Sequence, residues 1–273
     1  MGTLISTLRL VHPGPAAAVV TLSAVLGAVL LAQADLPLDD RWLLTVASVA
    51  GSQAFIGALN DLVDRERDVA GGRTDKPLVS GAATISGALW LISIGLAVEL
   101  AALLELGTLP LLLGVAATAS AVLYDLALSR TPLSPLPYLV SFGLLPAWIA
   151  AGVGLPLERI AAGVPLAAGF AAAAHLANAL RDYEADAAIG SRTLAQLLGR
   201  RTTHMLAAGL SLAVGLGVGI ALMVGGSPSP TAIALGVAGL IAIGAGATDE
   251  RRLWGAMLLA AVAWTAAWAI STG

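Results

Sequence analysis

The stretch Asn60-Asp61-Leu62-Val63-Asp64-Arg65-Glu66-Arg67-Asp68 follows a long apolar run and opens a polar segment. Asp61, Asp64 and Asp68 recur at i, i+3 and i+7, so a helix would carry all three on one face, beside the Asn60 amide. Like charges at these spacings repel one another and destabilise an isolated helix. A bound cation would offset that repulsion, and carboxylate oxygens suit Mg²⁺. Taken alone, the stretch is more typical of a solvated acidic helix end.

The composition of the chain is that of an integral membrane protein. Of the 273 residues, 58% are hydrophobic and 11% are charged, whereas soluble domains carry about 25% charged residues. The absence of cysteine excludes disulfides and thiolate metal sites.

The first apolar run ends in Ala32-Gln33-Ala34, which resembles a signal-peptidase site. That run is long enough to span a bilayer, so we expect a first transmembrane helix there.

Nine segments are apolar enough and long enough to cross a bilayer as helices, which takes about 20 residues each. We therefore expect an all-α, polytopic membrane protein: nine transmembrane helices in one bundle, with two Asp-rich loops at 61–83 and 180–203. Residues 1–273 are expected to form a single integral-membrane domain. The expected helices run near 15–33, 42–60, 84–104, 108–127, 136–153, 161–179, 204–224, 231–247 and 253–270.

The basic residues are unevenly distributed between the two sides of the membrane. With the N-terminus inside, 12 of the 14 Lys and Arg residues fall in cytoplasmic segments, and only Arg41 and Arg159 fall outside. Basic residues favour the cytoplasmic side, so we expect a cytoplasmic N-terminus and a C-terminus on the opposite side. Both Asp-rich loops, and hence the active site, then face the cytoplasm. Glu99 and Glu105 flank a short external turn and are expected to be solvated.

A second acidic motif, Asn178-Ala179-Leu180-Arg181-Asp182-Tyr183-Glu184-Ala185-Asp186, ends the sixth apolar segment. Asn178, Asp182 and Asp186 would share a helical face at i, i+4 and i+8. Two acidic motifs interleaved with Lys and Arg suit a diphosphate substrate, because carboxylates hold Mg²⁺ while cations neutralise the remaining phosphate charge. The substrate's apolar tail would lie between helices rich in small residues.

The two motifs also repeat one pattern. Asp64-x-x-x-Asp68-x-x-x-Gly72 matches Asp182-x-x-x-Asp186-x-x-x-Gly190 at an offset of 118 residues, and Arg and Thr follow each glycine. Four predicted helices separate the copies, and an even number makes them run parallel across the membrane. This indicates two half-bundles related by an axis along the membrane normal.

At these residues the sequence resembles the UbiA-type intramembrane prenyltransferases. Asn60-Asp61-x-x-Asp64-x-x-x-Asp68 resembles the family's first signature. Asn178-x-x-Arg181-Asp182-x-x-x-Asp186-x-x-x-Gly190-x-Arg192-Thr193-Leu194 resembles the second. Lys76-Pro77-Leu78-Val79-Ser80-Gly81 is similar to a short basic element that follows the first motif. The resemblance covers nearly the whole chain, because nine helices with motifs after the second and sixth match the family's architecture.

The resemblance implies a Mg²⁺-dependent enzyme that ionises a prenyl diphosphate and transfers the prenyl group to an acceptor. It implies no nucleic-acid partner, and the lipid bilayer is the expected surroundings. His175 lies within an apolar span and is predicted to accept a proton from the acceptor substrate; the alternative is a structural histidine that bonds to a neighbouring helix. The implied metal ligands are Asn60, Asp61, Asp64, Asp68, Asp182 and Asp186, and the five aspartates among them are also the implied catalytic residues. The implied diphosphate-binding residues are Arg67, Arg73, Lys76 and Arg192. The candidates for the acceptor pocket are Tyr124, Asp125, Arg130, His175 and Asn178.

Two departures from the family pattern leave the acceptor open. Ser191 stands where members with this second motif often carry Lys, and Tyr124-Asp125-Leu126-Ala127-Leu128-Ser129-Arg130 replaces a basic cluster with one cation and an added Asp. An aromatic quinone precursor is the default acceptor, with a polyol phosphate, a sugar phosphate, a chlorophyll-type ring or a carotenoid as alternatives. Cyclisation of the prenyl chain without an acceptor is a further alternative, and so is a transporter that uses the Asp clusters as an ion site.

Overall fold

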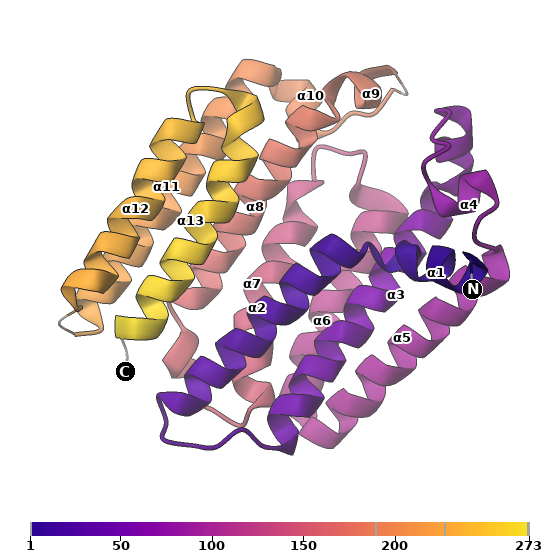
Figure 1. Ribbon diagram of the computed structural model, residues 1–273. Coiled ribbons are helices and arrows are strands. Elements are labelled where there is room, and N and C mark those ends of the chain that lie inside the picture. The colour runs from indigo at the N-terminus through magenta and orange to yellow at the C-terminus, as the bar shows by residue number, and fades with distance from the viewer. Residues whose placement is uncertain (1, 189, 227, 272–273) are drawn as a thin grey trace. The chain divides into compact units, whose positions relative to one another are not determined.

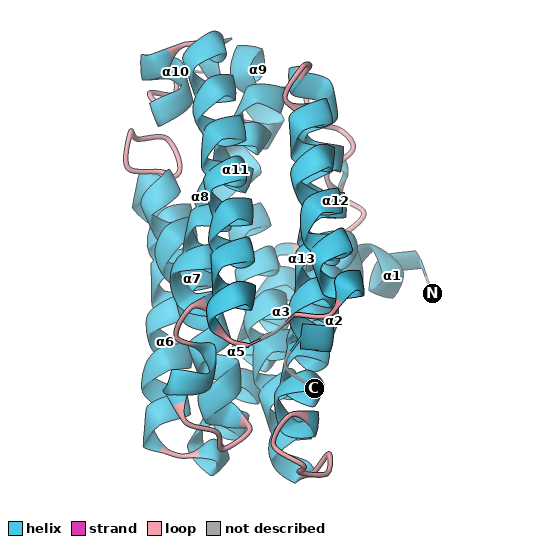
Figure 2. Cartoon of the chain, turned by 90° about the vertical axis from the view of Figure 1, so that its left-hand side faces the viewer, coloured by secondary structure: helices cyan, strands magenta, loops and turns pink. Residues whose placement is uncertain are grey.

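The computed structural model describes residues 2–188, 190–226 and 228–271, and for residues 2, 3 and 185 the backbone alone. Helix is the only regular secondary structure in these residues (Figure 2). The all-α prediction is therefore confirmed.

The long helices follow the predicted apolar segments to within a few residues at most ends. They are α2 (Pro13–Ala32), α3 (Asp40–Ala70), α5 (Ile85–Leu106), α6 (Thr108–Leu123), α7 (Pro135–Gly152), α8 (Gly163–Arg181), α11 (Arg200–Val224), α12 (Pro230–Gly246) and α13 (Glu250–Ser271). Shorter helical pieces lie between them: α1 (Gly2–Leu8), η1 (Arg9–Val11), α4 (Pro77–Ser80), the π-helical turn η2 (Tyr124–Leu128), η3 (Leu157–Ile160), α9 (Tyr183–Ala188) and α10 (Leu194–Leu198).

Eight helices within the described residues are long and apolar enough to cross a membrane, with α6 extended by η2. The remaining long helix, α12, is apolar but has only 17 residues. A polytopic membrane fold is thus confirmed, and the count of nine spans stays a prediction.

α3 corrects one predicted boundary. The sequence predicted that this helix would end near residue 60 and give way to a loop, but it continues to Ala70 and is 31 residues long. The stretch Asn60–Asp68 therefore forms the last turns of a helix. Its three aspartates do share a helical face, since their spacing matches the helical repeat.

The chain divides into two compact units, and it passes from one to the other within η2, within α7 and within η3. Unit 1 comprises residues 1–127 and 144–159, and it holds the first acidic motif. Unit 2 comprises residues 128–143 and 160–273, and it holds the second. One motif copy in each unit agrees with the prediction of two half-bundles. A single functional domain over the whole chain stays a prediction.

In unit 1, α3 and α5 run side by side (Figure 1). Their backbones approach most closely at two glycines. A Cβ atom on Gly51 would lie 2.6 Å from the carbonyl oxygen of Gly95, and one on Gly95 would lie 2.7 Å from the carbonyl oxygen of Gly51. Small residues permit this close approach of membrane helices. The apolar core of this unit includes Val49, Leu103, Leu106, Ala117 and Trp148.

Glu99 does not lie at the surface, as predicted, but is buried on α5 with 1% of its area exposed. Its Oε1 accepts a hydrogen bond of 2.5 Å from the Thr118 hydroxyl on α6. That hydroxyl oxygen lies 2.8 Å from the Ser52 hydroxyl on α3. The prediction was wrong because Glu99 lies on a face of α5 that packs against α3 and α6, whose Ser52 and Thr118 hydroxyl groups form a hydrogen-bonded chain with its carboxyl. Glu105 is exposed, as predicted.

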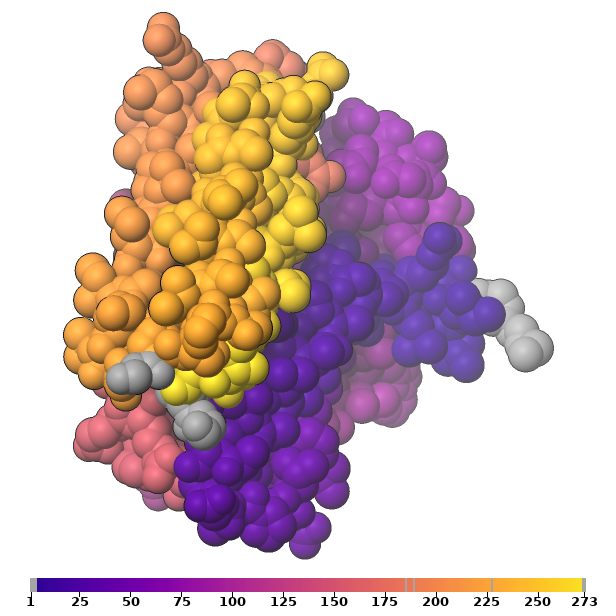
Figure 3. All heavy atoms as spheres, turned by 60° about the vertical axis from the view of Figure 1, so that its left-hand side comes forward, coloured from indigo at the N-terminus to yellow at the C-terminus, as the bar shows by residue number. Residues whose placement is uncertain are grey.

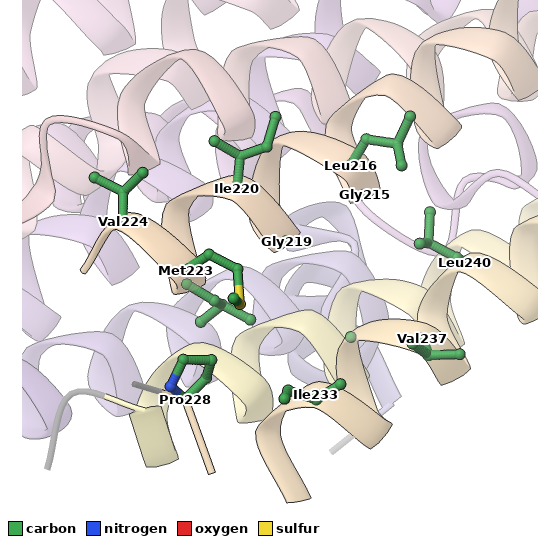
Figure 4. A pocket seen from close by; sticks show the side chains of 12 residues that line it. Gly215, Leu216, Gly219, Ile220, Met223, Val224, Pro228, Ile233, Val237 and Leu240 are labelled. Atoms are coloured by element: carbon green, nitrogen blue, oxygen red, sulfur yellow. The ribbon is translucent and has the colours of Figure 1, made fainter. Parts of the chain in front are cut away.

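In unit 2, α12 and α13 lie side by side, and their side chains meet along the face shown in Figure 3. Trp264 of α13 covers Gly239, and its Nε1 donates to the carbonyl oxygen of Gly236 at 3.1 Å. α11 and α12 border an apolar cavity of about 410 Å³ (Figure 4). Its lining includes the exposed side chains of Leu216, Ile220, Met223, Ile233 and Val237.

Candidate functional site

The first acidic motif occupies the last three turns of α3. Asp61 is buried, with 3% of its area exposed, whereas Asn60, Asp64 and Asp68 are partly buried. Burying carboxylates near one another is unfavourable unless cations or hydrogen-bond donors compensate. The contacts of each carboxylate therefore show what this site is built to hold.

Asp61 is compensated by two residues from outside α3. Lys76, which precedes α4, donates from Nζ to Oδ1 of Asp61 at 2.5 Å. The Nε2 atom of His12 lies 3.2 Å from the same oxygen. His12 joins η1 to α2 with φ +53° and ψ +67°, a left-handed conformation that non-glycine residues seldom adopt.

His12 was not predicted from the sequence. One signal could have found it: His12 immediately precedes the first long helix, and successive antiparallel helices bring the start of α2 to the same side as the end of α3. Lys76, by contrast, was predicted as a diphosphate-binding residue, and it does reach the acidic motif.

Asp64 and Asp68 are also surrounded by cations. Asp64 forms an ion pair with Arg67, one turn along α3. The charges that act on Asp68 are those of Lys76, Arg73 and Arg67, together with the like charge of Asp64.

Arg73, a predicted diphosphate-binding residue, is exposed and bonds to a carboxylate beyond the end of α3. It donates to Asp75 from Nε at 3.1 Å and from Nη2 at 3.3 Å. These hydrogen bonds hold the pKa of the Asp75 carboxyl below its usual range.

Asn60 and Asp125 connect α3 to the π-helical turn η2. The Nδ2 atom of Asn60 donates to Oδ1 of Asp125 at 2.9 Å. Asp125 is 6% exposed, and its Oδ2 has no hydrogen-bond partner within the described part of the chain. The structure thus brings Asp125, a predicted pocket residue, directly to the first motif. Tyr124 precedes it on the same turn and is partly buried.

The side chains of the first acidic motif offer carboxylate and amide oxygens, which are the ligand atoms that a hard divalent cation prefers. The unpartnered buried oxygen of Asp125 also fits such an ion. Among the described residues, however, no group of three or more Asp, Glu or His side chains is arranged closely enough to enclose one. Lys76 and Arg67 instead neutralise Asp61 and Asp64.

The second acidic motif, in unit 2, lies on two helical segments. α8 ends at Arg181, Asp182 forms a bend, and α9 begins at Tyr183. The predicted helical face through Asn178, Asp182 and Asp186 is therefore interrupted. Asp182 is exposed, while Asn178 and Asp186 are partly buried.

The repeated sequence pattern corresponds to a repeated helix cap. Gly72 and Gly190 both adopt left-handed conformations, with φ +68° and +74°. In each copy, the N–H of the residue after the glycine bonds to the carbonyl oxygen of the last motif aspartate, at 2.9 Å for Asp68 and 3.0 Å for Asp186. These are Schellman caps, which glycine at this position favours. The repeated sequence pattern therefore corresponds to the same local backbone structure in both copies.

The remaining predicted residues lie in unit 2. His175 is buried; its Nε2 lies 3.0 Å from the Ser134 hydroxyl oxygen, and its ring packs on Tyr138 with centroids 4.5 Å apart. These are the contacts of a structural histidine, and a proton-accepting role stays a prediction. The backbone N–H of Arg192 bonds to the carbonyl oxygen of Arg130 at 3.0 Å, so the main chain is in contact at these two residues.

Eight apolar helices long enough to cross a membrane, with acidic motifs at the ends of α3 and α8, define the described part of the chain as a polytopic integral membrane protein. The sequence matches the UbiA prenyltransferase family over residues 20–252. The chain belongs to this family, and it is an intramembrane prenyltransferase.

Solved structures share the fold. A digeranylgeranylglyceryl phosphate synthase is 15% identical over 100% of this chain and 99% of its own, with a TM-score of 0.77. A UbiA homologue from Aeropyrum pernix K1 is 22% identical over 92% and 96%, with a TM-score of 0.75. A UbiA homologue from Archaeoglobus fulgidus, solved bound to GPP and Mg²⁺, is 18% identical over 98% and 100%, with a TM-score of 0.66. No curated protein is similar enough in sequence to match.

Proposed function

We propose that this chain is a Mg²⁺-dependent prenyltransferase that ionises a prenyl diphosphate beside the last turns of α3 and transfers the prenyl group to an aromatic quinone precursor. One observation carries the proposal: three carboxylates share a face of α3, and Lys76 bonds to the most buried of them. The Archaeoglobus fulgidus homologue was solved with GPP and Mg²⁺, which are ligands that such a cluster suits.

In this proposal, the acidic residues of both motifs hold Mg²⁺ through their side-chain oxygens. When bound, Mg²⁺ supplies positive charge that stabilises the departing diphosphate. Lys76 exchanges its bond to Asp61 for one to a phosphate oxygen. The proposed metal ligands are Asn60, Asp61, Asp64, Asp68, Asp182 and Asp186, and the proposed diphosphate-binding residues are Lys76, Arg67, Arg73 and Arg192.

The reaction breaks the bond between the allylic carbon and the diphosphate oxygen, and both bonding electrons leave with the oxygen. The acceptor attacks the allylic carbon and releases a proton. Negative charge on the leaving group grows as the bond lengthens, so cations already in place stabilise the transition state more than the bound substrate. Apolar helix surfaces exclude water that would otherwise trap the carbocation.

The acceptor is the part of the proposal that depends on the family pattern alone. A polyol phosphate is the main alternative, because a digeranylgeranylglyceryl phosphate synthase shares the fold. Cyclisation of the prenyl chain without an acceptor is the second alternative. We further propose that the motif-bearing helix ends face the cytoplasm, in agreement with the distribution of Lys and Arg.

The test uses the purified protein in nanodiscs with Mg²⁺ and prenyl diphosphates of several lengths. Each reaction contains an aromatic acid, a glycerol-phosphate lipid or no acceptor, and mass spectrometry identifies the product. We expect a prenylated aromatic acid, and we expect Asp64→Ala and Asp182→Ala each to lower turnover about 100-fold or more. Glu66→Ala is the matched control, because Glu66 is an exposed carboxylate on α3 outside the acidic face.

Normal turnover in either aspartate variant would contradict the proposed site. A prenylated lipid in place of the aromatic product would reassign the acceptor, and a product formed without acceptor would indicate cyclisation. Metal-dependent substrate flux without any product would instead support a transporter.

A further inference from the structure

We propose that Asp125 is a positioning residue that fixes the orientation of the Asn60 side chain, so that the amide oxygen is available to a cation. This inference rests on the proposed function, since it concerns the same metal-binding face of α3. It assigns a role to the aspartate by which the chain departs from the family pattern.

The contact between the two side chains has only one chemically sensible direction. Asn60 donates from Nδ2 to Oδ1 of Asp125 at 2.9 Å. An ionised carboxylate only accepts hydrogen bonds, whereas an amide can donate from one end or accept at the other. Asp125 therefore selects the nitrogen end of the amide and leaves the oxygen end free. That oxygen is the atom that can ligate a hard cation.

The burial of Asp125 argues against a purely structural role. One of its oxygens is hydrogen-bonded, and the other has no partner among the residues described, although the side chain is 6% exposed. A buried, incompletely paired carboxylate costs stability. An apolar residue at the end of α6 would avoid that cost.

The local backbone explains how Asp125 reaches α3. Residues Tyr124–Leu128 form a π-helical turn at the end of α6. Such a turn inserts an extra residue into the helix and re-aims the side chains that follow, and it is frequent at functional sites. Outer hydrogen-bond partners of metal ligands commonly fix the ligand's orientation. Asp125 has that relation to Asn60.

A direct metal ligand or a proton acceptor at position 125 would need the carboxylate charge itself. A positioning residue needs only the correct hydrogen-bond polarity with residue 60. These roles can be separated by exchanging the two side chains, because exchange reverses the polarity of the bond and conserves the total charge.

The experiment measures Mn²⁺ binding to the purified protein by the EPR signal of the free ion, without prenyl diphosphate. Asp125→Asn allows the amide pair to bond in either direction, and we expect it to weaken binding about tenfold or more. Asn60→Asp places two carboxylates in contact, and we expect no gain in binding. In the Asn60→Asp/Asp125→Asn double variant, the amide at position 125 donates to the carboxylate at position 60, and binding is restored.

The expected signature is an effect that depends on the background: Asn60→Asp fails to improve binding in the wild-type background but improves it in the Asp125→Asn background. Improved binding by Asn60→Asp in both backgrounds would overturn the positioning role, because binding would then follow the number of carboxylates and not the direction of the hydrogen bond between residues 60 and 125. Unchanged binding in Asp125→Asn would also overturn it. Glu66→Gln is the control and should bind Mn²⁺ as wild type does.

Two further readouts separate the possible failures. The metal-free unfolding midpoints of Asp125→Asn and of the double variant should stay near that of the wild type, which shows that a loss of binding is not a loss of the fold. Asn60→Asp should unfold at a lower midpoint, because it places two carboxylates in contact without a cation. If the wild-type protein binds no Mn²⁺, the proposed function fails together with this inference. If the wild type binds Mn²⁺ but Asn60→Asp has the same effect in both backgrounds, the proposed function stands and only the role of Asp125 is lost.

Discussion

Gly51→Ala should weaken the packing between α3, which carries the first acidic motif, and α5. A Cβ atom at Gly51 would lie 2.6 Å from the carbonyl oxygen of Gly95 and 2.6 Å from the backbone nitrogen of Glu99. Ordinary contacts of a Cβ atom begin at 3.4 Å, so the helices would have to separate by roughly 0.8 Å in a close-packed interior. Both obstacles are backbone atoms, which cannot rotate aside.

The magnitude follows from two opposing effects. Overpacking a well-packed interior costs about 1–3 kcal/mol, and the rigid backbone contacts place this substitution at the upper end. The separation would also stretch the hydrogen bonds that join Ser52, Thr118 and Glu99 across three helices. Alanine is favoured over glycine within a helix by about 1 kcal/mol. We therefore expect a net loss of about 2 kcal/mol in the free energy of unfolding.

The assay is denaturant unfolding of the detergent-solubilised protein, followed by circular dichroism. Gly209→Ala on α11 is the matched control, because no atom lies within 4 Å of a Cβ atom built there. The control should be as stable as the wild type or slightly more stable. If Gly51→Ala unfolds at the same denaturant concentration as Gly209→Ala, the close approach of α3 and α5 is wrong.

Two other predictions concern stability and orientation. Arg41→Met should lower the free energy of unfolding by about 1–3 kcal/mol, because Nη2 of Arg41 donates to carbonyl oxygens near the ends of both α5 and α7, at 3.1 and 3.4 Å. Arg159→Met, which removes one exposed contact of 3.5 Å, should change unfolding much less; equal losses would refute the assigned role of Arg41. In this cysteine-free chain, a membrane-impermeant maleimide should label Glu105→Cys in intact cells and Thr74→Cys only after permeabilisation. The reverse labelling pattern would invert the proposed orientation.

The sequence by itself determined the helical membrane fold, the approximate helix bounds and the two acidic motifs. These features are local: a spanning helix needs about 20 apolar residues, and a carboxylate face needs only helical spacing. The repeated Asp-x-x-x-Gly pattern also had a local cause, because Gly72 and Gly190 supply the left-handed residue of the same cap. The length of α3 was underestimated, because charged residues can extend a membrane helix beyond its apolar part.

Only the tertiary structure decided which groups meet. Asn60 and Asp125 are 65 residues apart, and Lys76 reaches Asp61 from the position just before the short helix α4. His12 joins the same carboxylate through a left-handed backbone conformation that local sequence does not predict. Glu99 is buried because its face of α5 packs against α3 and α6, which supply hydroxyl partners. Hydropathy and spacing describe each helix separately, whereas these contacts depend on how the helices pack against one another.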